Sequence, residues 1–200
     1  MGSYKLRWKQ MELKKGFSVL IMIAFFILSA AGNGNAQGDN DLRGLTFGGS
    51  IGYGRINYNY DNKAHQNEDT FALGFQGGYA VTRNIILGVE FNGWTLEGFD
   101  PWDKTKGESV SNYALFAEIF PFHSPMYFVG GAGVSRYINN NPRIKGRESG
   151  TALFIGCGYE FPITKSLKYA PQIRYSRGSY SGGDYYAAEL AIAVHWYYDK

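Results

Sequence analysis

The chain has 200 residues, which is enough for one domain, and it contains 27 glycines and 17% aromatic residues. Glycine is a poor helix former, and Tyr and Phe favour strands, so the composition indicates an all-β protein rather than a helical one. The formal net charge is +3 at pH 7, and Cys157, the single cysteine, excludes an intrachain disulfide.

The first predicted element is a secretory signal peptide over residues 1–36. Basic residues precede an apolar run from Phe17 to about Ala31, and Gly34-Asn35-Ala36 has the small-x-small pattern of a cleavage site. We expect cleavage after Ala36, and Met1 and Met11 are both possible start residues. The alternative is an uncleaved anchor, but an apolar run of about 15 residues is shorter than the roughly 20 that a membrane-spanning helix needs.

Removal of this leader changes the charge of the protein. The leader carries five basic residues and one acid, Glu12, so the +3 of the whole chain becomes −1 for residues 37–200. Binding to nucleic acid needs a basic patch on the folded domain, so the basic balance gives no support for that function. The cleavage point also lacks the cysteine of a lipoprotein.

Residues 37–200 repeat segments of roughly ten residues in which large apolar side chains alternate with small or polar ones, a period typical of strands with two different faces. The eight predicted strands are Leu45–Ile56, Thr70–Val81, Ile85–Leu96, Val110–Phe120, Met126–Tyr137, Thr151–Phe161, Leu167–Arg177 and Tyr186–Tyr198. In the glycine-rich fifth strand the two faces do not separate, and the orientation of its side chains stays open.

The composition of the two faces distinguishes a membrane barrel from a soluble one. In most strands one face is uniformly large and apolar, and the other is mostly Gly, Ala and Ser with occasional charged residues. A soluble barrel would bury the large apolar face, whereas a transmembrane barrel turns it toward lipid and keeps small and polar side chains inside. The pattern therefore predicts a transmembrane barrel.

The predicted connections alternate in length. Short links cover residues 82–84, 121–125 and 162–166, and longer polar links cover residues 57–69, 97–109, 138–150 and 178–185. Short periplasmic turns and longer external loops are typical of outer-membrane barrels, so we expect both termini in the periplasm. Aromatic residues near the strand ends predict two interfacial belts, with Tyr79, Phe120, Phe128, Phe161, Tyr169, Trp196 and Tyr198 on the periplasmic side and Tyr53, Phe71, Tyr113, Tyr175 and Tyr186 on the outer side.

These features resemble the small outer-membrane β-barrel proteins of the OmpA and OmpX type, often grouped as porin-family barrels. The resemblance covers residues 37–200 and rests on the strand and loop pattern, the glycine-rich strands and the last strand. It implies an all-β, eight-stranded antiparallel up-and-down barrel in the outer membrane of a Gram-negative-type bacterium. The family's C-terminal sorting signal is matched in spacing by Glu189, Ala191, Val194 and Trp196, although Ala191 replaces a glycine and four residues follow Trp196.

The inward face predicts a polar network in the lumen. Its candidate residues are Glu90, Glu118, Glu160, Arg174 and Glu189. Charges in a narrow lumen must be paired, hydrated or neutralised, so the set predicts a polar plug that fills the barrel. The alternative is a narrow water-filled pore, which the excess of acids would make cation-preferring.

The residues that could carry out catalysis or bind a metal do not indicate an enzyme. His65, His123 and His195 lack metal-ligand spacing, and the only adjacent His/Ser pair, His123-Ser124, lies in a predicted periplasmic turn. We therefore expect no catalytic site, no metal and no cofactor.

Three functions stay open. The first is a structural or surface-contact protein with exposed loops, the second is a narrow porin-like ion channel, and the third is a soluble exported barrel that binds a small apolar ligand. The expected partners are outer-membrane lipid, lipopolysaccharide and the barrel-assembly machinery, with no nucleic acid, and the barrel is expected to be a monomer.

Overall fold

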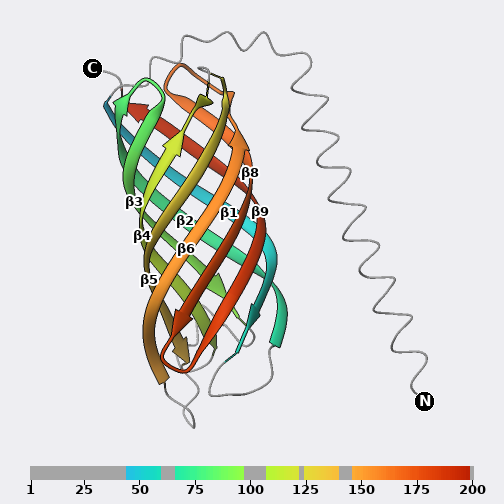
Figure 1. The fold of residues 1–200 in the computed structure, drawn as a ribbon. Coiled ribbons are helices and arrows are strands. Elements are labelled where there is room, and N and C mark those ends of the chain that lie inside the picture. The colour runs from blue at the N-terminus through green and yellow to red at the C-terminus, as the bar shows by residue number, and fades with distance from the viewer. Residues whose placement is uncertain (1–43, 60–65, 97–106, 122–123, 140–145, 199–200) are drawn as a thin grey trace, which may run out of the picture. The chain divides into compact units, whose positions relative to one another are not determined.

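A computed structural model describes residues 44–59, 66–96, 107–121, 124–139 and 146–198. The predicted signal peptide, His65 and His123 lie outside these residues. Residues 39–200 make up one compact unit, and its described part is an antiparallel β-barrel (Figure 1). No helix in the described ranges is long and apolar enough to cross a membrane.

The eight predicted strands are confirmed. They are β1 (Gly44–Tyr58), β2 (Gln66–Thr82), β3 (Ile85–Thr95), β4 (Glu108–Ile119), β5 (Met126–Asn139), β6 (Gly146–Tyr159), β8 (Leu167–Tyr180) and β9 (Gly183–Tyr198). A two-residue strand, β7 (Phe161–Pro162), follows β6 after Glu160. It keeps the register of β6 against β8, because Gly158 pairs with Gln172 and Phe161 pairs with Tyr169, so β6 and β7 form one wall of the barrel.

The sheet closes on itself because β1 pairs with both β2 and β9, and β6 pairs with both β5 and β8. A path of paired residues that starts at Leu45 on β1 and passes once around the barrel returns to β1 at Arg55, ten residues further along. A stagger of this kind tilts strands by about 35–45° to the barrel axis. Figure 1 shows this tilt.

The two ends of the barrel differ. At one end β1 begins and β9 ends, because Leu45, the second residue of β1, pairs with Tyr198, the last residue of β9, and we call this the terminal end. At the other, the loop end, β1 and β2 extend further than predicted, to Tyr58 and from Gln66.

One predicted long link is wrong. Residues 178–185 were expected to form an external loop, but β8 and β9 pair as far as Tyr180 and Gly183, so only Ser181 and Gly182 turn the chain. The strands continue because Ser179 and Asp184 still form a paired position of the ladder, so the polar sequence of this stretch reflects a solvated hairpin rather than a loop.

The two faces of the sheet separate as predicted. Outward residues such as Phe75 (62% exposed), Leu115 (69%) and Ile155 (66%) alternate with buried or partly buried neighbours. The structure also settles the fifth strand, where Tyr127, Val129 and Ser135 are buried inside β5 while Phe128 and Val134 are exposed. The prediction that Phe120 belongs to the periplasmic aromatic belt is wrong. Phe120 points inward, as Glu118 does, and is only 1% exposed.

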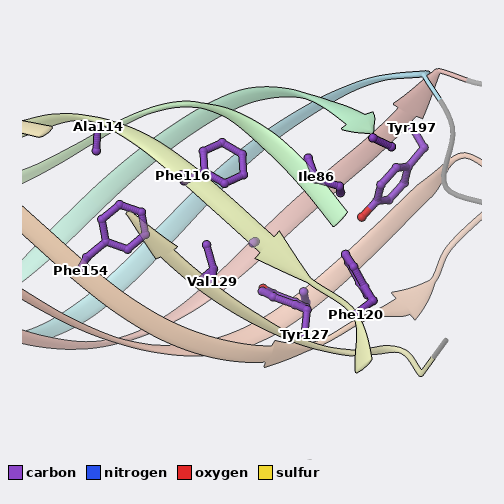
Figure 2. Packing of buried hydrophobic residues seen from close by; sticks show 11 residues of the cluster. Ile86, Ala114, Phe116, Phe120, Tyr127, Val129, Phe154 and Tyr197 are labelled. Carbon is purple, nitrogen blue, oxygen red and sulfur yellow. The ribbon is translucent and has the colours of Figure 1, made fainter. Parts of the chain in front are cut away.

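Large side chains fill the interior, and glycine gives them room. Figure 2 shows Phe116, Phe120, Tyr127 and Phe154 projecting from the walls into the barrel. A Cβ atom on Gly158 would lie 2.5 Å from the Tyr127 ring, so this inward position accommodates only glycine beside the tyrosine. The small residues of the inward face therefore leave room for the aromatic and charged side chains of the lumen.

Candidate functional site

The barrel lumen is the candidate site, because it buries every charged residue that the sequence placed on the inward face. Glu90, Glu118, Glu160, Arg174 and Glu189 are each at most 7% exposed. They come from β3, β4, the junction of β6 and β7, β8 and β9. The structure divides them between two groups. Glu118 and Glu160 lie near the terminal end, in what we call the lower cluster. Glu90, Arg174 and Glu189 lie further toward the loop end, in what we call the upper cluster.

The lower cluster centres on Glu160, a carboxylate held by three donors. Lys168 Nζ donates to Glu160 Oε2 at 2.8 Å, and His195 Nδ1 lies 2.7 Å from Glu160 Oε1. The hydroxyl of Tyr197 donates to the same Oε1. A buried carboxylate is tolerated when its lone pairs are engaged in this way, so the cluster is a satisfied ionic network inside the wall.

Glu118 lies beside this network with a less complete set of partners. One ligand atom each from Glu118, Glu160 and His195 lies within 4.8 Å of the others, and Glu118 Oε1 makes no hydrogen bond. The Glu160 oxygens already accept hydrogen bonds from Lys168, His195 and Tyr197. The donor set therefore fits an ionic network better than a metal centre.

The upper cluster is built around Arg174. Its guanidinium pairs with the Glu90 carboxylate and lies over the Phe154 ring, 3.7 Å from the ring centroid. Glu189 accepts a hydrogen bond from Asn92 Nδ2 at 3.3 Å. One buried cation thus stands among two buried acids, and an aromatic face supplies further stabilisation of the guanidinium.

A small cavity lies between the two clusters. It has a volume of about 10 Å³, and its lining includes Gln76, Glu90, Arg174 and His195. This volume corresponds to about one water molecule. The lumen in this region is therefore filled by side chains rather than open along its axis.

Aromatic residues close the lumen above the upper cluster. This aromatic plug consists of Tyr58, Trp94, Tyr137, Tyr180 and Tyr185, all at most 6% exposed. Tyr137 and Tyr180 stack at 5.2 Å between ring centroids, and Trp94 lies 5.9 Å from Tyr185. The hydroxyl of Tyr185 donates to Asn112 Oδ1 at 2.7 Å, so the plug is tied to the polar wall beneath it.

Sequence reasoning missed part of the lower cluster. Lys168 is buried and holds Glu160, but it stands at the beginning of β8, where the predicted inward set began only later. The sequence could have revealed it, because Lys168 precedes Arg174 by an even number of residues on the same strand and therefore points to the same face. His195 was placed inward without a role, and the structure makes it a partner of Glu160.

The residues of the predicted sorting signal occupy both faces of β9. Glu189 and Ala191 are buried inside, whereas Val194 and Trp196 are 41% and 45% exposed on the outer surface. Ser124 begins a described range, but His123 lies outside the described residues, so the geometry of the His123-Ser124 pair is not defined.

Comparisons with known proteins identify the fold. The structure is similar to Neisserial surface protein A, with a TM-score of 0.60 and 12% identity over 77% of this chain and 97% of that chain. Weaker similarities include Ail of Yersinia pestis (TM-score 0.47, 16% identity, 78% of this chain and 100% of that chain) and the N-terminal β-barrel domain of Pseudomonas aeruginosa OprF (TM-score 0.43, 16% identity, 74% and 97%).

Neither the protein-family models nor the curated proteins match the sequence. The fold is that of the small eight-stranded outer-membrane barrels, as the resemblance in the sequence implied.

Proposed function

We propose that this protein is an integral outer-membrane barrel with a sealed lumen, and that its function is structural or one of surface contact through the loop end. The main support for this proposal is the distribution of side chains, which is the reverse of that in a soluble barrel. Large apolar residues cover the outside, with Leu115 69% exposed, while Glu118 and Glu160 are 1% exposed inside. Such a surface is stable in lipid and would aggregate in water.

The orientation follows from the same proposal. The terminal end would face the periplasm, and the loop end, with the segments between β1 and β2, β3 and β4, and β5 and β6, would face outward. We expect cleavage after Ala36 to release residues 37–200. The proposed C-terminal signal, made of Glu189, Ala191, Val194 and Trp196, would be recognised by the assembly machinery. Mass spectrometry of the protein purified from membranes tests the cleavage by its N-terminal residue.

Membrane fractionation with electrophoresis before and after boiling tests the location. The protein should be found in the outer-membrane fraction, and its mobility should change on boiling because a closed barrel resists detergent until heated. A protein in the soluble periplasmic fraction with unchanged mobility would contradict the proposal.

A narrow channel is the second candidate, and the charged residues along the lumen favour it. Four buried acids face Arg174, Lys168 and His195, so a conducting state would prefer cations. The filled lumen and the aromatic plug favour the sealed barrel over this candidate. Bilayer recordings of the wild type, Glu118→Gln and Arg174→Ala distinguish the two, because altered conductance in the variants would support a channel.

The soluble ligand-binding barrel has no comparable support. A small apolar ligand needs an apolar interior, whereas the lumen cavity has a volume of about 10 Å³ and is lined partly by Glu90 and Arg174. The outward apolar surface would then be left in water, which disfavours this function.

A further inference from the structure

The outer surface carries charge just beyond its apolar band at the loop end. On β1, β5 and β8 the outward residue that follows Tyr53, Val134 or Tyr175 toward this end is an arginine, namely Arg55, Arg136 or Arg177. Arg147 lies further along β6. These positions would meet the headgroup layer of a bilayer that covers the apolar band.

The arginines differ in their partners. Arg55 donates to both carboxylate oxygens of Asp69 at 2.7 and 3.0 Å. The charge on that side is therefore neutralised. By contrast, the outward positions of β5, β6 and β8 include no acid within the described residues, so positive charge gathers on three neighbouring strands.

Register brings these side chains toward one point. Arg136 pairs with Ser149 and Arg177 pairs with Leu153, so Thr151 on β6 is a diagonal neighbour of both arginines. Their strands lie about 10 Å apart, two strand spacings, and their partners on β6 are four residues, about 13 Å, apart, so the two long side chains meet only by extending toward Thr151 from opposite sides. The hydroxyls of Thr151 and Ser179 lie 3.0 Å apart between them.

Neighbouring groups make the surface suited to an amphiphile. The Arg177 guanidinium lies 5.1 Å from the centroid of the Tyr186 ring, which holds the charge against the barrel wall. Directly toward the terminal end, Leu153, Ile155 and Val134 are 52–66% exposed and would contact acyl chains. A phosphate above and hydrocarbon below match this arrangement in charge and polarity.

We propose that Arg136 and Arg177, with Thr151 between them and Arg147 beyond, bind the phosphate headgroup of an anionic lipid whose acyl chains lie on the exposed apolar residues of β5, β6 and β8. This inference rests on the proposed function, since it needs the barrel in a bilayer. It adds a specific lipid site to one side of the barrel and predicts that the opposite side, at Arg55 and Asp69, has none.

Native mass spectrometry of the barrel released from phosphatidylcholine nanodiscs that contain a minor fraction of phosphatidic acid tests the site. The wild type should retain phosphatidic acid in preference to phosphatidylcholine. Replacement of each arginine should weaken this retention about fivefold, so the R136Q/R177Q double variant should lose about 25-fold. The matched control is Arg55→Gln, an arginine at the corresponding height whose charge is already paired, and it should retain the lipid as the wild type does.

Each outcome has a defined meaning. Equal retention by the double variant and the wild type, or equal loss in Arg55→Gln, would overturn the site. Displacement of the lipid by soluble glycerol phosphate would also overturn it, because the acyl chains would then contribute nothing. The heat-dependent mobility of every variant is measured in parallel, so that failure to insert, which would refute the proposed function, is distinguished from insertion without lipid selection.

Discussion

Replacement of Glu160 by glutamine should destabilise the barrel strongly, because one carboxylate satisfies three buried donors. Lys168 Nζ, His195 Nδ1 and the Tyr197 hydroxyl all contact it, and Glu160 is 1% exposed. Loss of one member of a buried ion pair costs about 3–5 kcal/mol, since the remaining charge has no counterion. For a urea m-value of about 2 kcal/mol/M, the unfolding midpoint should fall by roughly 1.5–2.5 M.

Urea titration in lipid vesicles, followed by the heat-dependent gel shift, measures this midpoint. The matched control is Asp69→Asn, which breaks an ion pair whose side chains are about half exposed and should cost at most about 1 kcal/mol. The E160Q/K168M double variant should recover part of the stability, because it removes the uncompensated ammonium. A midpoint for Glu160→Gln equal to that of Asp69→Asn would refute the reasoning.

Three further predictions test other parts of the structure. Leu115→Arg places a charge in the middle of the apolar band and should destabilise the lipid-embedded barrel by about 2–4 kcal/mol in urea titration, whereas a small effect would indicate that this face meets water. Gly158→Leu should cost about 1–3 kcal/mol of stability, because the leucine side chain would overlap the Tyr127 ring. It should also slow refolding, as measured by the gel shift. A variant as stable as the wild type would show that the lumen is loosely packed. The W94A/Y185A double variant removes two members of the aromatic plug and should raise conductance above that of the wild type in planar bilayers, and unchanged conductance would mean that another part of the lumen closes it.

The alternation of side chains made much of the fold predictable. A strand in a barrel has one lipid face and one lumen face, so the inward position of Glu90, Glu118, Glu160, Arg174 and Glu189 could be inferred without coordinates. β5 was the exception, since glycines at positions 130, 131 and 133 offer no side chains to compare. There the neighbouring strands determine which side Tyr127 and Val129 face.

The contacts of the lumen could not be predicted in the same way. The partners of Glu160 stand 8, 35 and 37 residues away in sequence. They meet because the stagger around the closed sheet brings β8 and β9 to the level of the β6–β7 junction, and that stagger depends on the register of eight strand pairs. Alternation assigns a side chain to a face but does not specify its height in the barrel.

The claim that the apolar face meets lipid is tested most directly by fluorescence quenching with brominated lipids. Trp196 is 45% exposed on the outer surface of β9, and Trp94 is 2% exposed inside the barrel. Variants that keep only one of these tryptophans are folded into vesicles with lipids brominated along the acyl chain. We predict strong quenching of Trp196 and little quenching of Trp94, and equal quenching of both, or of neither, would contradict a lipid-embedded barrel with a filled lumen.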